Sequence, residues 1–359
     1  MPFGSSTRNL IFLLAVLWFA FLGCHAALCQ SSEEQLFSKS RPAMGTDFTI
    51  YLYASNKEKA DEELEAAFDE IERIEEALSN YRPNSELSRI NRLAAATAIT
   101  TDPEVFHLLQ TSFDYSRLSD GAFDITVGPL MRAWGFFRKN GQYPSHAELA
   151  RARESVGWKK VTLDPMERRV KFDVPGMELD MGGIGKGYAV DRVVDLLRDA
   201  GVTAALVDAG SSTLYALGSP PGKDGWKVVV PRPADRLHAV SDVVLRDRAL
   251  STSGSYEKFF RLNGKTYCHI MDPRTGEPVQ GMLQTSVIAP TGTASDALST
   301  TMFVMGPAAG GKLLESMPNT SALWITNNTN ELHIQQWHWP GRLCRTTDDC
   351  VAGEENKKR

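Results

Sequence analysis

The chain has 359 residues, of which 42% are hydrophobic and 23% charged, and its formal net charge is −5. This balance is typical of a globular protein and excludes a long disordered chain. The acidic excess argues against a general nucleic-acid-binding protein, which normally carries a basic surface, so we expect no nucleic-acid partner. Beyond the N-terminal segment, the sequence has no apolar stretch long enough to cross a bilayer.

The N-terminal segment has the pattern of an export signal. Arg8 precedes an apolar run over residues 10–23, and small residues follow. A basic start, a short apolar core and a small-residue end predict that residues 1–29 direct export. The alternative is an uncleaved membrane anchor, against which the shortness of the run argues.

Two positions could end this signal. Residues 21–24 (FLGC) are similar to a lipoprotein box with the Leu displaced by one position, in which Cys24 carries the lipid. Residues 27–29, before Gln30, could instead form an ordinary signal-peptidase site. The first interpretation is favoured slightly and predicts an exported lipoprotein at the periplasmic face of the inner membrane. The polar residues 30–40 are then expected to be a tether.

From residue 41 onward, the hydrophobic pattern predicts mixed strands and helices. Apolar and polar residues alternate over 43–54, as in a strand, and residues 58–79 carry apolar side chains at helical spacing. Further elements are a helix at 106–118, a hairpin at 158–172, a helix at 188–200, strands at 202–208, 226–230, 243–251 and 282–289, and helices at 294–305 and 310–317. Because strands and helices do not alternate regularly, we expect an α+β fold with one catalytic domain.

A glycine-rich segment at residues 180–189 (DMGGIGKGYA) opens one of these helices. Glycines let backbone N–H groups approach a phosphate, and a helix N-terminus favours negative charge. Lys186 adds a cation there. The segment matches neither the dinucleotide-binding pattern nor the P-loop, so tight packing is an alternative to phosphate binding.

A second polar segment, at residues 293–300, contains Asp296 and Thr300 four residues apart. On a helix these side chains share a face, and their oxygens suit a hard cation such as Mg²⁺. The alternative is an ordinary helix start, with Thr293 or Ser295 as N-cap and Asp296 in the first turn.

His269 precedes a turn that begins at Asp272 and ends at Gly276. A histidine at a strand end could act as a general base, although a single histidine is more often structural. Near the C-terminus, Cys344 and Cys350 are a candidate disulfide in an exported protein.

Taken in order, seven segments of this sequence resemble the FAD:protein FMN transferase (ApbE) family, formerly called the thiamine-biosynthesis lipoprotein family. They are MGTDFTI, LSNYRPNSELSRIN, GAFDITVGPLMRAWGF, LDMGGIGKGYAVD, LSTSGSYEKFF, HIMDPRTGEPV and TASDALSTTMFVMG. The resemblance implies a single α+β domain of mixed strands and helices over residues 41–335, with the FAD site in a central cleft. Residues 336–359 are then a C-terminal extension.

The resemblance also implies site residues. Asp296, Thr300 and the backbone carbonyl of Gly185 are expected to bind Mg²⁺, with the carbonyl of Gly183 as the alternative. His269 falls on the position of the catalytic base. The positions expected to contact FAD are Met44, Tyr81, Ala122, Phe123, Asp124, Asp180, Gly182, Gly183, Lys186, Ser253 and His269.

The implied reaction is cleavage of FAD with transfer of FMN to a Ser or Thr of an acceptor protein, through a phosphoester bond. AMP is released, and the expected acceptor is an exported or membrane redox protein. One alternative is an FAD pyrophosphatase that yields FMN and AMP; another is a non-enzymatic periplasmic flavin-binding lipoprotein. Two positions depart from the family pattern: Ser211 stands where many members have a second glycine, and Gly185 stands where many have Ala.

Overall fold

A computed structural model describes residues 34–137, 141–233, 235–328 and 331–344. The expected export segment, Cys24 and Cys29 lie outside these described residues. None of the helices within them has the length and apolar character that crossing a membrane requires.

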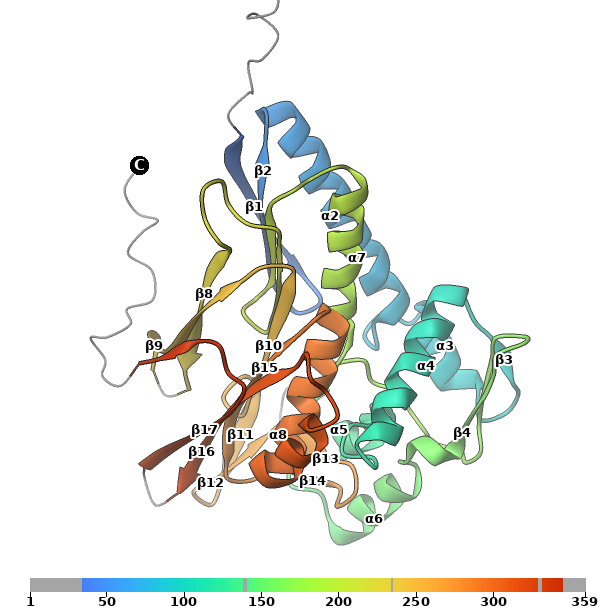
Figure 1. Cartoon of the computed structure of the whole chain (residues 1–359). Coiled ribbons are helices and arrows are strands. Elements are labelled where there is room, and N and C mark those ends of the chain that lie inside the picture. Colours follow the sequence, from blue (N-terminus) through green and yellow to red (C-terminus); the bar gives the residue numbers. More distant parts are fainter. Residues whose placement is uncertain (1–33, 138–140, 234, 329–330, 345–359) are drawn as a thin grey trace, which may run out of the picture.

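An eight-stranded sheet forms the centre of the described fold (Figure 1). Every neighbouring pair in it is antiparallel. Its spatial order is β1 (Gln35–Ala43), β2 (Thr46–Ala54), β6 (Ala205–Ala209), β7 (Thr213–Leu217), β10 (Arg248–Gly254), β15 (Met282–Ala289), β16 (Ser321–Asn328) and β17 (Glu331–Trp337). The mixed, antiparallel arrangement confirms the α+β class.

Three long helices cover one face of this sheet: α2 (Lys57–Leu78), α7 (Gly185–Asp199) and α8 (Gly292–Leu314). The apolar residues of α2 recur at helical spacing and are buried, from Leu64 through Ile71 to Leu78. Asn56 caps this helix by accepting a hydrogen bond from the Lys59 amide at 2.9 Å. In Figure 1 the three helices lie to the right of the central strands, where α2 and α7 build the main core and most apolar residues of α8 form a second cluster.

A second, three-stranded sheet covers the opposite face. It consists of β8 (Trp226–Arg232), β9 (Asp235–Leu245) and β18 (Arg342–Leu343). Its apolar residues pack with Leu214, Leu250 and Ile288 of the central sheet. Central strand β7 is therefore buried along its whole length, which explains its continuous apolar sequence.

Shorter elements surround the lower part of the main helices in Figure 1. The helices are α3 (Glu86–Leu93), α4 (Pro103–Leu118), α5 (Gly128–Ala133) and α6 (His146–Glu154), with 3₁₀ turns at Ile125–Val127 and Trp158–Lys160. A small sheet contains β3 (Ile99–Thr100), β5 (Arg169–Phe172) and β4 (Val161–Asp164). Two hairpins pair β11 (Phe259–Leu262) with β12 (Lys265–Cys268) and β13 (Met271–Asp272) with β14 (Glu277–Pro278). The predicted hairpin at 158–172 is confirmed as β4 and β5.

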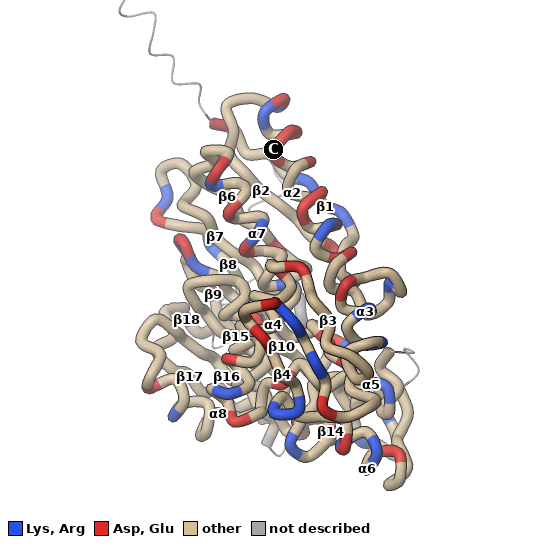
Figure 2. The backbone as a smooth tube through the Cα atoms, turned by 90° about the vertical axis from the view of Figure 1, so that its right-hand side faces the viewer, with Lys and Arg blue, Asp and Glu red and all other residues tan. Residues whose placement is uncertain are grey.

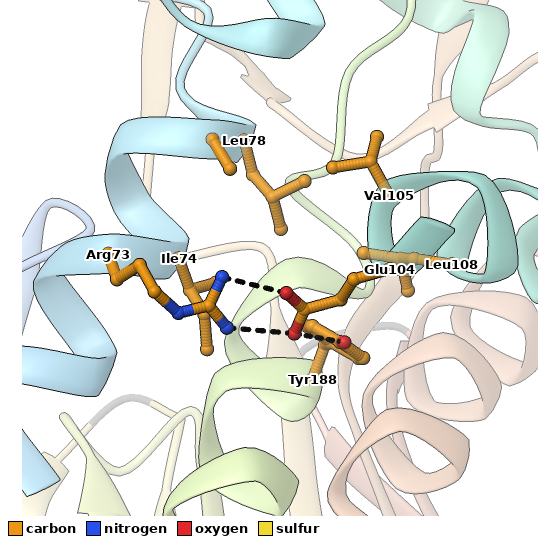
Figure 3. A pocket seen from close by; sticks show the side chains of 8 residues that line it. Arg73, Ile74, Leu78, Glu104, Val105, Leu108 and Tyr188 are labelled. Atoms are coloured by element: carbon orange, nitrogen blue, oxygen red, sulfur yellow. Dashed lines mark hydrogen bonds and ion pairs between the residues drawn. The ribbon is translucent and has the colours of Figure 1, made fainter. Parts of the chain in front are cut away.

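Charged side chains connect α2, α4 and α7 around a shallow pocket (Figure 3). Glu104 of α4 lies 2.7 Å from Arg73 of α2 and accepts a hydrogen bond from the Tyr188 hydroxyl of α7 at 2.6 Å. The guanidinium of Arg73 lowers the pKa of the Glu104 carboxyl. Along α2, acidic residues far outnumber the basic residues Lys57, Lys59 and Arg73 (Figure 2). The network fixes the three helices relative to one another.

The structure differs from the expected boundaries at both ends. The tether expected at 30–40 is wrong for Gln35–Ser40, because these residues pair with β2 as part of β1. The extension expected from residue 336 begins inside the fold, since Trp337 ends β17 and Trp339 is buried against Ser241. Cys344 is disulfide-bonded, and Cys350, its expected partner, lies outside the described residues.

Two further elements differ from the sequence prediction. The strand expected at 243–251 is two strands, because β9 ends at Leu245 and β10 begins at Arg248 after a turn in which Asp247 has a positive φ. The two helices expected at 294–305 and 310–317 are two segments of α8, separated by a kink at Gly306 and Pro307.

Thr285 of β15 generates a stability prediction. Its side chain is fully buried, and its hydroxyl has no hydrogen-bond partner within the described part of the chain. Such a group costs about 1–3 kcal/mol, whereas Val has the same shape without the hydroxyl. We expect Thr285→Val to raise the free energy of unfolding by about 1 kcal/mol in urea titrations. A lower free energy of unfolding would show that the hydroxyl has a partner.

Candidate active site

The glycine-rich segment forms a tight turn immediately before α7. The amides of Ile184 and Gly185 both donate to the carbonyl of Met181, at 3.1 and 2.7 Å. The Asp180 carboxylate accepts a hydrogen bond from the Gly182 amide at 2.7 Å. Ile184, the N-cap residue, makes no side-chain capping bond. Helix α7 thus begins at Gly185, three residues before the predicted start at residue 188, and Lys186 lies in its first turn.

Helices α7 and α8 cross where each has a glycine, Gly187 in α7 and Gly292 in α8. The amide of Gly187 donates to Oδ2 of Asp296 at 2.9 Å. A Cβ on Gly187 would lie 2.2 Å from the carbonyl oxygen of Gly292 and 2.7 Å from Cβ of Asp296. Only glycine therefore permits this contact.

Asp191, one turn further along α7, holds the start of α8. Its carboxylate accepts hydrogen bonds from the Gly292 amide at 2.5 Å and from the Thr293 amide and hydroxyl at 2.8 and 2.6 Å. The N-cap of α8 is Thr291, whose hydroxyl accepts a hydrogen bond from the Ala294 amide. The expectation that Thr293 or Ser295 caps the helix is therefore wrong, and Asp296 lies beyond the first turn.

Thr300 lies on the same side of α8 as Asp296, facing the glycine-rich turn. Its Oγ1 is 3.3 Å from the Ser253 hydroxyl of β10. A Cβ on Gly183 would lie 3.2 Å from Thr300 Oγ1 and 3.2 Å from Cε2 of Phe123. A Cβ on Gly185 would instead face Met181 and Met44. The turn, α8 and Phe123 therefore converge at one place.

The oxygen groups at this place fit a Mg²⁺ ion. Asp296 is only 5% exposed, and its burial raises the pKa of the carboxyl while the Lys186 charge lowers it. The described ranges contain no group of three or more His, Cys, Asp or Glu side chains that could hold a metal ion. A cation here would therefore use one carboxylate together with a hydroxyl, a backbone carbonyl and substrate oxygens. That is a donor set typical of Mg²⁺.

His269 lies half-buried beside two lysines. Its amide donates to the Lys258 carbonyl at 2.9 Å, and its Nδ1 lies 3.2 Å from the same oxygen. Burial, together with the positive charges of Lys258 and Lys186, lowers the pKa of His269 to about 4. The ring is therefore neutral at neutral pH. With Nδ1 donating to the carbonyl, Nε2 is the acceptor nitrogen.

The other expected FAD positions lie in varied surroundings. Met44 has a positive φ and contacts the core at the β1–β2 turn, and Tyr81 is exposed against Phe137. Ala122 and Phe123 are buried. Both oxygens of the Asp124 carboxylate already accept hydrogen bonds, from the Thr126 amide and hydroxyl and from the Trp158 amide. The side chain of Asp124 therefore has a structural use within the fold.

Sequence analysis missed several residues that contact the expected site. Asp191 is the last residue of a matched segment, but nothing in that segment indicates that it binds the start of α8. Thr213 and Ser251 belong to strands whose pattern indicates only burial, yet their hydroxyls bond each other at 2.9 Å beneath α8. Such contacts arise from tertiary packing, which local sequence does not encode.

Comparisons with known proteins show what the chain as a whole is similar to. The ApbE family model matches residues 44–324. The protein named FAD:protein FMN transferase from Haemophilus influenzae is 31% identical over 317 residues, covering 85% of this chain and 90% of its own. The protein of the same name from Klebsiella pneumoniae (strain 342) is 30% identical over 299 residues, covering 83% and 91%.

Solved structures show the same fold. The Thermotoga maritima ApbE protein superposes with a TM-score of 0.77 at 30% identity, covering 85% of this chain and 97% of its own. The apo Pseudomonas stutzeri flavinyl transferase ApbE gives 0.76 at 28% identity, covering 85% and 95%. The chain belongs to the ApbE family. As a member it is an enzyme, a transferase.

The contact between α7 and α8 generates the next prediction. We expect Gly187→Ala to lower the free energy of unfolding by about 1–3 kcal/mol, because the added methyl group overpacks the helix crossing. Gly311→Ala in α8 is the matched control, since a Cβ there would meet only Trp337, at 3.9 Å. Because alanine has a better helix propensity than glycine, Gly311→Ala should stabilise the fold by up to about 1 kcal/mol. Equal denaturation midpoints for the two variants would contradict this account.

Proposed function

We propose that this enzyme cleaves FAD and transfers the FMN half to a Ser or Thr hydroxyl of an acceptor protein, with AMP as the leaving group. The names of its relatives support the substrate and the transfer. One observation in this chain carries the proposal. A neutral histidine, a lysine and a buried carboxylate lie around the glycine-rich turn.

In this reaction one oxygen–phosphorus bond forms and another breaks. The acceptor hydroxyl oxygen attacks the phosphorus of the FMN half, and the bond from that phosphorus to the bridging diphosphate oxygen breaks. His269, with Nε2 as acceptor, takes the proton from the attacking hydroxyl. The leaving AMP keeps the electron pair of the broken bond, and the charge of Lys186 stabilises the oxygens on which negative charge develops.

Asp296, Thr300 and a backbone carbonyl of the turn, at Gly185 or Gly183, would hold Mg²⁺. When bound there, the ion neutralises the charge of the diphosphate and makes it accessible to an oxygen nucleophile. Burial raises the pKa of the Asp296 carboxyl, and the charge of Lys186 and the Gly187 amide oppose that rise, which favours the ionised form that a ligand of this kind requires.

The proposal includes export and an exported acceptor. The basic and apolar pattern of residues 1–29 supports export, with Cys24 as the lipidated residue at the periplasmic face of the inner membrane. Mass spectrometry of exported and membrane proteins, with and without the gene, tests this part. A flavin mass on a Ser or Thr that disappears with the gene identifies the acceptor, and its persistence contradicts the proposal.

Transfer and hydrolysis are distinguished by the fate of the flavin. Incubation with FAD, Mg²⁺ and an acceptor protein should leave fluorescent flavin on that protein in a denaturing gel. Free FMN and AMP alone would indicate an FAD pyrophosphatase. Intact FAD would indicate a flavin-binding protein without this activity.

The role of His269 gives a kinetic prediction. We expect His269→Ala to retain FAD binding and to lose about 10²–10⁴-fold in kcat, the usual contribution of a general base. The wild-type kcat/KM should stay constant as pH falls from about 7 to about 5 and decline only below that range, because the ring becomes protonated near its pKa of about 4. Lost FAD binding with high residual turnover would make His269 a binding residue. An acidic limb centred near the ordinary histidine value of 6.5 would contradict its depressed pKa.

The role of Asp296 gives another prediction. Asp296→Ala should abolish transfer even at saturating Mg²⁺, because it removes the single carboxylate of the expected cation site. Asp195→Ala is the control, since Asp195 lies about half-exposed on the outer side of α7. Wild-type rates for Asp296→Ala at saturating Mg²⁺ would refute the cation assignment.

A further inference from the structure

A layer of buried and half-buried hydroxyl groups lies between α8 and the central sheet. Its members are Thr213 of β7, Ser251 and Ser253 of β10, and Ser295, Ser299 and Thr300 of α8. Thr213, Ser251 and Ser295 are fully buried. Apolar residues usually fill such an interface, because an unpaired buried hydroxyl is costly. The members of this hydroxyl layer are hydrogen-bonded to one another, and the layer includes Thr300 and adjoins Asp296 through Ser295 and Ser299.

The first chain of hydrogen bonds in the layer leads to Asp296. The Ser251 hydroxyl donates to Thr213 Oγ1 at 2.9 Å and lies 2.6 Å from the Ser295 hydroxyl. Because a hydroxyl has one proton, Ser251 accepts from Ser295, whose proton is shared with the Gly292 carbonyl at 3.0 Å. With Oγ1 accepting from Ser251, the proton of Thr213 is left for another acceptor, and the Thr213 hydroxyl is one of the groups that lower the pKa of the Asp296 carboxyl.

The second chain leads to Thr300. The Ser299 hydroxyl donates to the backbone carbonyl of Asp296 at 2.9 Å. Ser253 lies 2.8 Å from Ser299 and 3.3 Å from Thr300. Since the proton of Ser299 is committed, Ser253 donates to Ser299 and Thr300 donates to Ser253. Thr300 Oγ1 then keeps its lone pairs for a ligand outside the layer.

We infer that Thr213 and Ser253 are positioning residues, which orient Asp296 and Thr300 as oxygen ligands for a divalent cation. The inference rests on the cation role proposed above for those two ligands. Its physical basis is that both hydrogen-bond chains run toward the ligands. They direct a donor proton at the carboxylate and leave acceptor lone pairs on the hydroxyl. Partners of this kind fix the geometry of metal ligands, and their loss typically lowers metal affinity about 10–100-fold.

The test compares Thr213→Val, which keeps the shape but removes the hydroxyl, with Thr213→Ser, which keeps the hydroxyl. Mn²⁺ serves as the probe, and its binding to the whole protein is followed by the electron paramagnetic resonance of the free ion. We expect Thr213→Val to raise the Kd for Mn²⁺ about tenfold or more. Thr213→Ser should stay within about threefold of wild type, and the Mg²⁺ concentration for half-maximal turnover should follow the same order.

Thr285→Val is the matched control, because Thr285 is an equally buried threonine of the neighbouring strand β15 whose hydroxyl has no partner among the described residues. Its Mn²⁺ affinity should equal that of wild type. Thermal melting of every variant shows whether it is folded. If Thr213→Val does not fold, Ser253→Ala serves in its place, with the same expected loss of Mn²⁺ affinity.

Equal Mn²⁺ affinity in wild type and in the folded variant, whether Thr213→Val or Ser253→Ala, would overturn the inference. So would equal losses in Thr213→Ser and Thr213→Val, because packing rather than the hydroxyl would then be responsible. Asp296→Ala separates this failure from that of the proposed function. Unchanged Mn²⁺ affinity in Asp296→Ala would refute the cation site itself. If Asp296→Ala loses Mn²⁺ binding but substitutions at Thr213 and Ser253 have no effect, the cation site stands and only the positioning role of these two residues is rejected.

Discussion

The contact of α7 with α8 at Gly187 is the constraint on which the rest of the site depends. Because neither Gly187 nor Gly292 has a side chain, the two helix backbones approach closely enough for an amide of α7 to bond a carboxylate of α8. Asp191 closes the same interface one turn later by binding the start of α8. The glycine-rich turn and the polar face of α8 are consequently parts of one rigid unit.

Charge within this unit suits the polyanionic substrate proposed above. Burial raises the pKa values of Asp180, Asp191 and Asp296, and backbone amides that donate to each carboxylate oppose that effect. At His269 the pKa changes in the opposite direction, because burial and the charges of Lys258 and Lys186 lower it and so favour the neutral imidazole. In the proposed reaction the same two cations would favour the histidine as a proton acceptor and would offer positive charge to phosphate oxygens.

Periodicity in the sequence was sufficient for the elements that pack on their own pattern. The apolar spacing of α2 and the hairpin of β4 and β5 are confirmed. The hydrophobic pattern gave wrong predictions where contacts with distant parts of the chain determine the local structure. Gln35–Ser40 looks polar enough for a tether, but each residue pairs with β2. The N-cap of α8 also escaped prediction, because Thr291, Thr293 and Ser295 are equally suitable caps by type and only the contact with Asp191 selects among them.

The two departures from the family pattern concern backbone rather than side-chain chemistry. Gly210 and Ser211 both have positive φ, at 66° and 61°, which explains why a pair of glycines suits this turn. Serine in that conformation costs about 1–2 kcal/mol more than glycine, and the bond from its amide to the Asp208 carboxylate at 2.6 Å opposes that cost. A methyl group at Gly185 would meet Met181 and Met44 at 3.4 and 3.6 Å, ordinary contact distances. Alanine and glycine are therefore interchangeable at that position, whereas at Gly187, two residues later, the crossing of the helices permits glycine alone.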